Sequence, residues 1–138
     1  MPRLLRMPEA AALGLHATVL LAGNSNGPVP VRELAAALKA SQAHLSKVMQ
    51  RLVRAGLVAS TRGPRGGFVL ARPSEEITLL QVYEAIEGRI EPGNCVFGDA
   101  PCDRETCIFG VFLVDFDARF REYLAQARLC DLVTGRLA

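Results

Sequence analysis

Apolar residues recur at helical spacing in several stretches of the chain, separated by short polar or glycine-rich breaks. The first stretch opens at Pro8 and ends in the polar run at residues 23–28, which predicts an N-terminal helix. A short second helix is predicted over residues 31–38. Ser41 then has the chemistry of an N-cap, and Gly56 that of a C-terminal glycine. The third helix between them has four apolar residues on one face: Leu45, Val48, Met49 and Leu52.

After the third helix the pattern becomes that of a hairpin. Residues 57–61 and 67–70 predict two short strands around a basic, glycine-rich tip at residues 62–66. Thr78 is expected to cap a fourth helix that ends at Gly88. Residues 89–106 are expected to form an irregular loop.

A long last helix carries one continuous apolar stripe. Its members are Phe109, Phe112, Leu113, Phe116, Phe120, Tyr123, Leu124 and Ala127. No further helix is expected after it to cover the stripe. Either the stripe packs on the first helix of the same chain, or much of it packs against a second subunit. The second alternative is favoured, because an uncovered stripe of this length promotes aggregation.

Composition places the chain among single-domain globular proteins. It has 138 residues, half of them apolar, and no apolar run reaches the roughly 18 residues of a membrane span. Arg3 and Arg6 before an apolar stretch imitate a signal peptide, but Pro8, Glu9 and His16 interrupt it. We therefore expect a cytoplasmic protein without a membrane partner.

The net charge of +2 conceals an uneven distribution. Residues 1–72 hold ten basic side chains against two acidic ones, a formal charge of +8, whereas residues 73–138 hold six against twelve, a charge of −6. A basic half of this kind predicts a nucleic-acid-facing module. Together the elements predict a mainly α fold with a small β-hairpin wing, a winged helix-turn-helix followed by a long C-terminal dimerisation helix.

The polar face of the third helix and the hairpin tip are the expected DNA-binding surface. A Gln there suits adenine edges, a Lys suits guanine or phosphate, and Arg side chains at the tip suit a minor groove. An ordinary solvated face is the alternative, but the chain has no acidic residue between Glu33 and Glu75. The expected DNA-binding residues are Ser41, Gln42, Ala43, Ser46, Lys47, Gln50, Arg51, Arg62 and Arg65, with Arg54 on the same outward face.

Three of the four cysteines crowd into one stretch, at Cys95, Cys102 and Cys107. Soft thiolates select an iron–sulfur cluster or zinc, and three are one ligand short of four. Cys130, about 33 Å away if the long helix continues, is not expected to be the fourth and is interpreted as a small buried residue. The histidines are expected to serve elsewhere, His16 in packing or an interface and His44 in packing or a phosphate contact.

The phrase at residues 56–73, followed by Glu76-Ile77-Thr78 and Glu87-Gly88, resembles the family of bacterial regulators that includes IscR and NsrR. The resemblance implies a homodimer that binds a pseudo-palindromic operator in double-stranded DNA and usually represses. It also implies that the cysteines hold a [2Fe–2S] or [4Fe–4S] cluster that senses iron–sulfur status, nitric oxide or redox state. It offers Glu9 as a fourth ligand from the partner subunit; alternatively, Glu9 only complements the helix dipole.

The chain departs from this family in two places. Gly110 stands where IscR carries a histidine three residues after its third cysteine, and the cysteine spacing is six and four rather than five and five. A cluster-free thiol switch or a partner-controlled regulator therefore stays open. An enzyme or electron carrier is disfavoured, because the chain lacks a catalytic triad, a phosphate loop and a deaminase motif. The expected division is a DNA-binding domain at 1–88, a sensor loop at 89–107, and a dimerisation helix with tail at 108–138.

Overall fold

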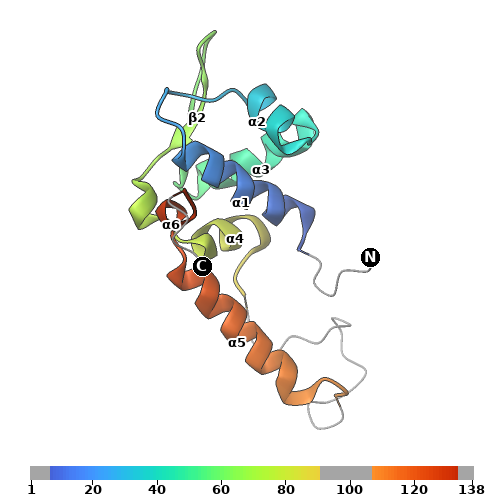
Figure 1. Ribbon diagram of the computed structural model, residues 1–138. Coiled ribbons are helices and arrows are strands. Elements are labelled where there is room, and N and C mark those ends of the chain that lie inside the picture. The colour runs from blue at the N-terminus through green and yellow to red at the C-terminus, as the bar shows by residue number, and fades with distance from the viewer. Residues whose placement is uncertain (1–6, 91–106, 134–138) are drawn as a thin grey trace.

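The computed structural model describes residues 7–90 and 107–133, which form a mainly helical fold with one β-hairpin (Figure 1). The predicted fold class is confirmed. In chain order the elements are α1 (Glu9–Ala22), α2 (Val31–Leu38), α3 (Gln42–Arg54), β1 (Val58–Thr61), β2 (Gly67–Leu70), the 3₁₀ turn η1 (Ser74–Glu76), α4 (Leu79–Glu87), α5 (Gly110–Gln126) and α6 (Leu129–Val133).

Helix α1 lies in the middle of the fold, and α3, α4 and α6 pack around it (Figure 1). The apolar face of α3 faces this core as predicted: Leu45, Val48, Met49 and Leu52 are all buried. Fully burying such side chains contributes about 1.5–3 kcal/mol each, so the orientation of α3 is set mainly by its apolar face. The polar face of α3 is consequently turned to solvent.

The turn between α2 and α3 has defined caps on both sides. Lys39 adopts the left-handed conformation (φ 53°, ψ 44°), and the amide of Ala40 donates to the carbonyl of Ala35 at 2.9 Å. The Ser41 hydroxyl accepts a hydrogen bond from the His44 amide at 3.3 Å, which caps α3 as predicted. Gly56 (φ 75°) ends α3. These caps fix the angle at which α3 leaves the turn.

The hairpin pairs β1 with β2 in antiparallel register, with Val58 opposite Leu70 and Thr61 opposite Gly67. The loop before α2 pairs with β2 through an isolated antiparallel bridge. The amide of Val29 donates to the Phe68 carbonyl at 3.0 Å, and the amide of Phe68 donates to the Val29 carbonyl at 2.9 Å. The hairpin projects at one end of the molecule, and α5 extends at the other (Figure 1). The predicted strands are confirmed to within one residue at their ends.

Helix α4 has a complete capping box. The Thr78 hydroxyl accepts from the Gln81 amide at 3.2 Å, and the Gln81 side chain accepts from the Thr78 amide at 2.9 Å. Gly88 follows its last turn with φ 88°. Thr78 and Gly88 therefore mark the ends of α4, as predicted.

The end of the chain differs from the sequence prediction. After Ala127 the backbone leaves the helix (ψ 127°), and α6 follows, packed against α1 and η1 with Leu129 fully buried. The prediction that no helix follows the long one was wrong. Helix α6 has only five residues, which are too few to give a recognisable helical pattern of apolar positions. Cys130 thus lies on α6, half-buried, and not on the long helix.

The stripe on α5 is covered only toward its C-terminal end, and by α4 rather than by α1. Phe120 packs edge-on against Tyr83 with ring centroids 5.8 Å apart, and Leu124 is buried. Burial, with Glu87 and Asp117 nearby, raises the pKa of Tyr83. Toward the start of α5, apolar side chains are exposed, with Val111 82% and Phe112 65% accessible. The fold therefore does not bury the whole stripe against the first helix of the same chain.

Within the described part of the chain, no helix combines the length and the apolar character that crossing a membrane requires.

Candidate nucleic-acid interface

The outward face of α3 presents a mainly polar surface without acidic residues. Lys47, Gln50 and Arg54 are exposed on the side opposite the buried face. At the start of the helix, Gln42 and Ala43 are exposed and Ser46 is half-buried. The first turn of a recognition helix is the part that reaches base edges in this class of fold. The backbone thus brings most of the expected α3 residues onto one accessible face.

Arg51 is exposed like Lys47 and Arg54, but it differs from them in making a hydrogen bond to another helix. Its Nη1 donates a hydrogen bond to the backbone carbonyl of Ile86 in α4, at 2.9 Å. Its guanidinium is therefore directed toward the helix behind α3. Lys47 and Arg54, one turn before and nearly one turn after it, have no hydrogen-bond or ion-pair partner among the described residues.

The hairpin tip carries the two predicted arginines in exposed positions, Arg62 and Arg65. The tip is closed by a hydrogen bond from the Gly66 amide to the Gly63 carbonyl at 2.9 Å. A β-carbon on Gly67 would collide with the backbone of Val29 and lie 2.7 Å from the nitrogen of Pro30. Gly67, the second glycine of the pair, therefore permits the close approach of the hairpin to the chain before α2. The sequence around Gly67 does not indicate this need for a glycine.

The electrostatics of this surface are one-sided. Residues 34–74 contain no Asp or Glu. In the described part of the chain, ion pairs join Arg119 to Asp115 and Arg121 to Glu84, and neither involves α3 or the hairpin. Lys39, exposed in the turn before α3, belongs to the same basic surface although it was not among the predicted site residues. The sequence did contain a signal for Lys39, namely a basic residue in the turn of the predicted helix-turn-helix.

The predicted metal ligands are only partly within the described residues. Cys95 and Cys102 lie outside them. Cys107 is half-buried just before α5, where its carbonyl accepts from the Gly110 amide at 3.1 Å. Glu9 is exposed as the first residue of α1. Among residues 7–90 and 107–133, no three His, Cys, Asp or Glu side chains are grouped to hold a metal ion.

The histidines occupy separate places. His16 is exposed on α1, with its Nδ1 2.7 Å from the Ala12 carbonyl oxygen, so it is not packed within this chain. His44 is half-buried in the first turn of α3. Neither lies in a ligand cluster of the described residues.

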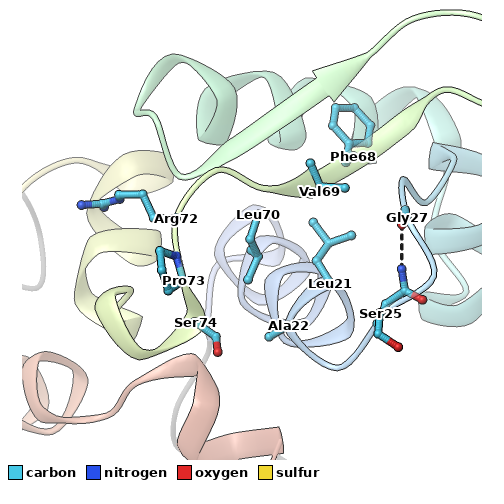
Figure 2. A pocket seen from close by; sticks show the side chains of 11 residues that line it. Leu21, Ala22, Ser25, Gly27, Phe68, Val69, Leu70, Arg72, Pro73 and Ser74 are labelled. Carbon is cyan, nitrogen blue, oxygen red and sulfur yellow. Dashed lines mark hydrogen bonds between the residues drawn. The ribbon is translucent and has the colours of Figure 1, made fainter.

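A cavity lies behind the hairpin, between the end of α1, β2 and η1 (Figure 2). Leu21 and Ala22 face Val69 and Leu70 across it, and Asn24 bridges its rim by donating to the Gly27 carbonyl at 2.8 Å. The guanidinium of Arg72 points away from these apolar side chains (Figure 2). Arg72 is thus the one charged residue among the described residues that line the cavity, and it lies at the edge rather than among the apolar side chains.

A helix-turn-helix with a basic wing, held on an apolar core and without an acidic residue over residues 34–74, defines a winged helix-turn-helix DNA-binding regulator. Comparison with known families agrees. The family model Rrf2, described as an iron-dependent transcriptional regulator, matches residues 7–135. The chain belongs to the Rrf2 family of transcriptional regulators.

Relatives of this family are regulators as well. The transcriptional regulator IscR of Sodalis glossinidius is 31% identical over 112 residues, which cover 81% of this chain and 68% of that protein. A regulator of Bacillus subtilis, YwgB, is 50% identical over 52 residues, 38% of this chain and 33% of its own. These are transcriptional regulators and not enzymes, which confirms that prediction.

Solved structures show the same architecture. CymR of B. subtilis, described as the global cysteine regulator of that organism, has a TM-score of 0.77 at 27% identity and covers 95% of this chain and 98% of its own. IscR of T. potens has a TM-score of 0.75 at 24% identity, over 96% of this chain and 88% of its own, a likeness of fold alone. The winged helix fold of this chain is thus shared with CymR of B. subtilis and IscR of T. potens.

Proposed function

We propose that this chain is a repressor that binds a pseudo-palindromic operator in double-stranded DNA as a homodimer. The observation that carries the proposal is the exposed face of α3, free of acidic residues and adjacent to the basic hairpin tip. Such a face neutralises phosphates and reads base edges at the same time. Residues 1–88 form the DNA-reading part in this proposal, 89–107 the sensing part and 108–138 the dimer-forming part.

Each side chain of the surface has a role that follows from its chemistry. Gln42 and Gln50 are assigned to base edges, where an amide pairs with adenine, and Lys47 to guanine or phosphate. Ser41, Ala43 and Ser46 line the start of α3, where small side chains allow close approach to the duplex. Arg62 and Arg65 are assigned to the minor groove beside the half-site, where the phosphate potential is strongest.

The exposed side of α5 is assigned to the dimer contact. Phe112 and Phe109 are accessible by 65% and 44%, and Phe116 stacks on Phe112 with ring centroids 6.2 Å apart. Apolar side chains exposed in a row at one end of a helix are typical of a partner surface. Pairing of two α5 helices would set the distance between the two α3 helices, and hence the half-site spacing.

The sensing part is assigned to Cys95, Cys102 and Cys107. The chemistry of this donor set fits an iron–sulfur cluster, because three soft thiolates occur within thirteen residues. When bound, a cluster supplies a centre that reacts with oxidants or nitric oxide. Cys107 would connect it to the first turn of α5, and Glu9 of the partner subunit is the proposed fourth ligand.

A thiol switch without a cluster is the second candidate, since it needs the same cysteines. Among the structural neighbours is an oxidised form of CymR from Staphylococcus aureus, with a TM-score of 0.73 at 22% identity, which shows the fold alone. In this alternative a disulfide between two of the three cysteines changes the geometry of the dimer. The DNA surface is the same in both candidates.

The DNA surface is tested with a duplex selected from a random library by the unmodified protein. Each substitution is present in both subunits of the proposed dimer and removes two phosphate contacts. Lys47→Gln and Arg65→Gln should therefore each lower the magnitude of the slope of log K against log salt by about 1.8. Arg119→Gln on α5 makes the same charge change away from the surface and should leave the slope unaltered. Equal slopes in all three variants would contradict the placement of the surface.

The cluster is tested by purification without oxygen. A brown protein with stoichiometric iron and sulfide, lost in Cys102→Ser and Cys107→Ser but retained in Cys130→Ser, supports the cluster. A colourless protein whose operator affinity changes after oxidation with diamide, and recovers with dithiothreitol, supports the thiol switch instead.

A further inference from the structure

The hydrogen bond between Arg51 and Ile86 joins two helices that are 35 residues apart in the chain. Ile86 lies one residue before the end of α4, so its carbonyl is among the last four of the helix, which have no partner within it. The amide of Gly88 already satisfies the carbonyl of Glu84 at 2.9 Å. The Arg51 guanidinium therefore supplies a cap for α4 from another helix, with its positive charge at the negative end of the helix dipole.

The same residue of α4 is held from its other side. The Ile86 side chain is buried and reaches into the notch that Gly14 leaves on α1, next to Val48 of α3. The carbonyl of Ile86 thus binds α3 and its side chain packs on α1, so both helices are attached to the last turn of α4. Lys47 lies one turn before Arg51 on α3 and is exposed toward the proposed DNA side.

We propose that Arg51 is a positioning residue, which fixes the orientation of α3 by binding the last turn of α4 and does not contact DNA phosphate. The proposal rests on the proposed DNA-reading function. Loss of the hydrogen bond would leave the basic charge of the other residues in place and loosen the register of α3 in the groove. Discrimination between sequences should suffer, whereas the electrostatic attraction to any duplex should not.

The test compares Arg51→Gln and Arg51→Lys with Arg54→Gln, which removes a charge from an exposed α3 residue that makes no ion pair among the described residues. Each protein is titrated against the selected duplex and against a scrambled duplex of equal length and composition, over a series of salt concentrations. Cooperative unfolding in urea verifies that each variant is folded.

A positioning role predicts that Arg51→Gln lowers the ratio of selected to scrambled affinity by roughly threefold to thirtyfold. The salt slope of Arg51→Gln should equal that of the unmodified protein. Arg51→Lys should lose specificity too, because its shorter single ammonium does not reproduce the guanidinium bond to Ile86. It remains decisive should the Gln variant fail to fold.

A phosphate contact predicts other results, and these would overturn the proposal. Arg51→Gln would lower the magnitude of the salt slope by about 1.8, because both subunits of the dimer lose a contact, and would weaken both duplexes alike, and Arg51→Lys would behave as the unmodified protein. If the unmodified protein itself does not prefer the selected duplex, the proposed DNA-reading function fails, and the role of Arg51 falls with it. If it does prefer the selected duplex and Arg51→Gln keeps the full ratio, only the role of Arg51 is wrong.

Discussion

Ile86 of α4 packs into Gly14 of α1 so closely that a β-carbon at position 14 would overlap the Cδ1 of Ile86. Both residues are buried, and Val48 of α3 lies 3.3 Å from the same point. Three helices therefore meet where α1 has no side chain. This close approach places the end of α4 directly behind the recognition helix.

Gly14→Ala should destabilise the fold by about 1–3 kcal/mol, because the added methyl overpacks a filled site. Ile86→Val removes the overlapping Cδ1, so the double variant should lose less stability than the sum of the single ones. Urea unfolding measures all three free energies. Gly23→Ala, at the C-cap that follows the same helix, is the control: its β-carbon would meet no heavy atom nearer than 3.7 Å, and its stability should stay close to that of the unmodified protein.

Gly67→Ala tests the contact of the hairpin with the chain before α2. The new β-carbon would displace the backbone of Val29 and weaken its paired hydrogen bonds with Phe68. Amide exchange at Phe68 should accelerate, and affinity for the selected duplex should fall because the tip arginines lose their fixed position. Ser60→Ala, at an exposed position of β1, should change neither quantity. Unchanged exchange at Phe68 in Gly67→Ala would refute the contact.

Much of the DNA-binding half could be predicted from its sequence because its signals are local. Ser41, Thr78 and Gly88 mark helix ends through their own backbone preferences, and the four buried residues of α3 identify its inner face. The outward face then follows from helical geometry alone. This is why most of the expected α3 residues are found on one accessible surface.

The parts that sequence did not predict depend on contacts between distant segments. Arg51 has the same chemistry as Arg54, and only the position of Ile86 distinguishes them. The five residues of α6 are too few for a helical period, and their conformation is supported by the buried Leu129, whose amide donates to Ile77 at 3.0 Å. Such long-range partners have no signature in a single sequence.

Lys39→Gly should stabilise the fold by about 0.5–1 kcal/mol. Lys39 is the one non-glycine residue of the described chain with a positive φ, and a β-carbon is disfavoured there. Ala37→Gly, in the preceding helix, should instead cost about 1 kcal/mol, since glycine is a poor residue within a helix. Urea midpoints at constant slope measure both. DNA affinity of Lys39→Gly should nevertheless fall, because the basic surface loses one charge.

The exposed face of α5 predicts a dimer that a single charge would break. Phe112→Glu places a carboxylate on the exposed apolar row, so two α5 helices could pair only by burying that charge. We expect sedimentation to report a monomer, and affinity for a palindromic duplex to drop to that of a half-site. Ala118→Glu makes the same addition on the opposite side of α5, where the helix is exposed, and should remain a dimer. A Phe112→Glu protein that still sediments as a dimer would refute this face as the contact, because the unfavourable burial of the carboxylate would then not occur.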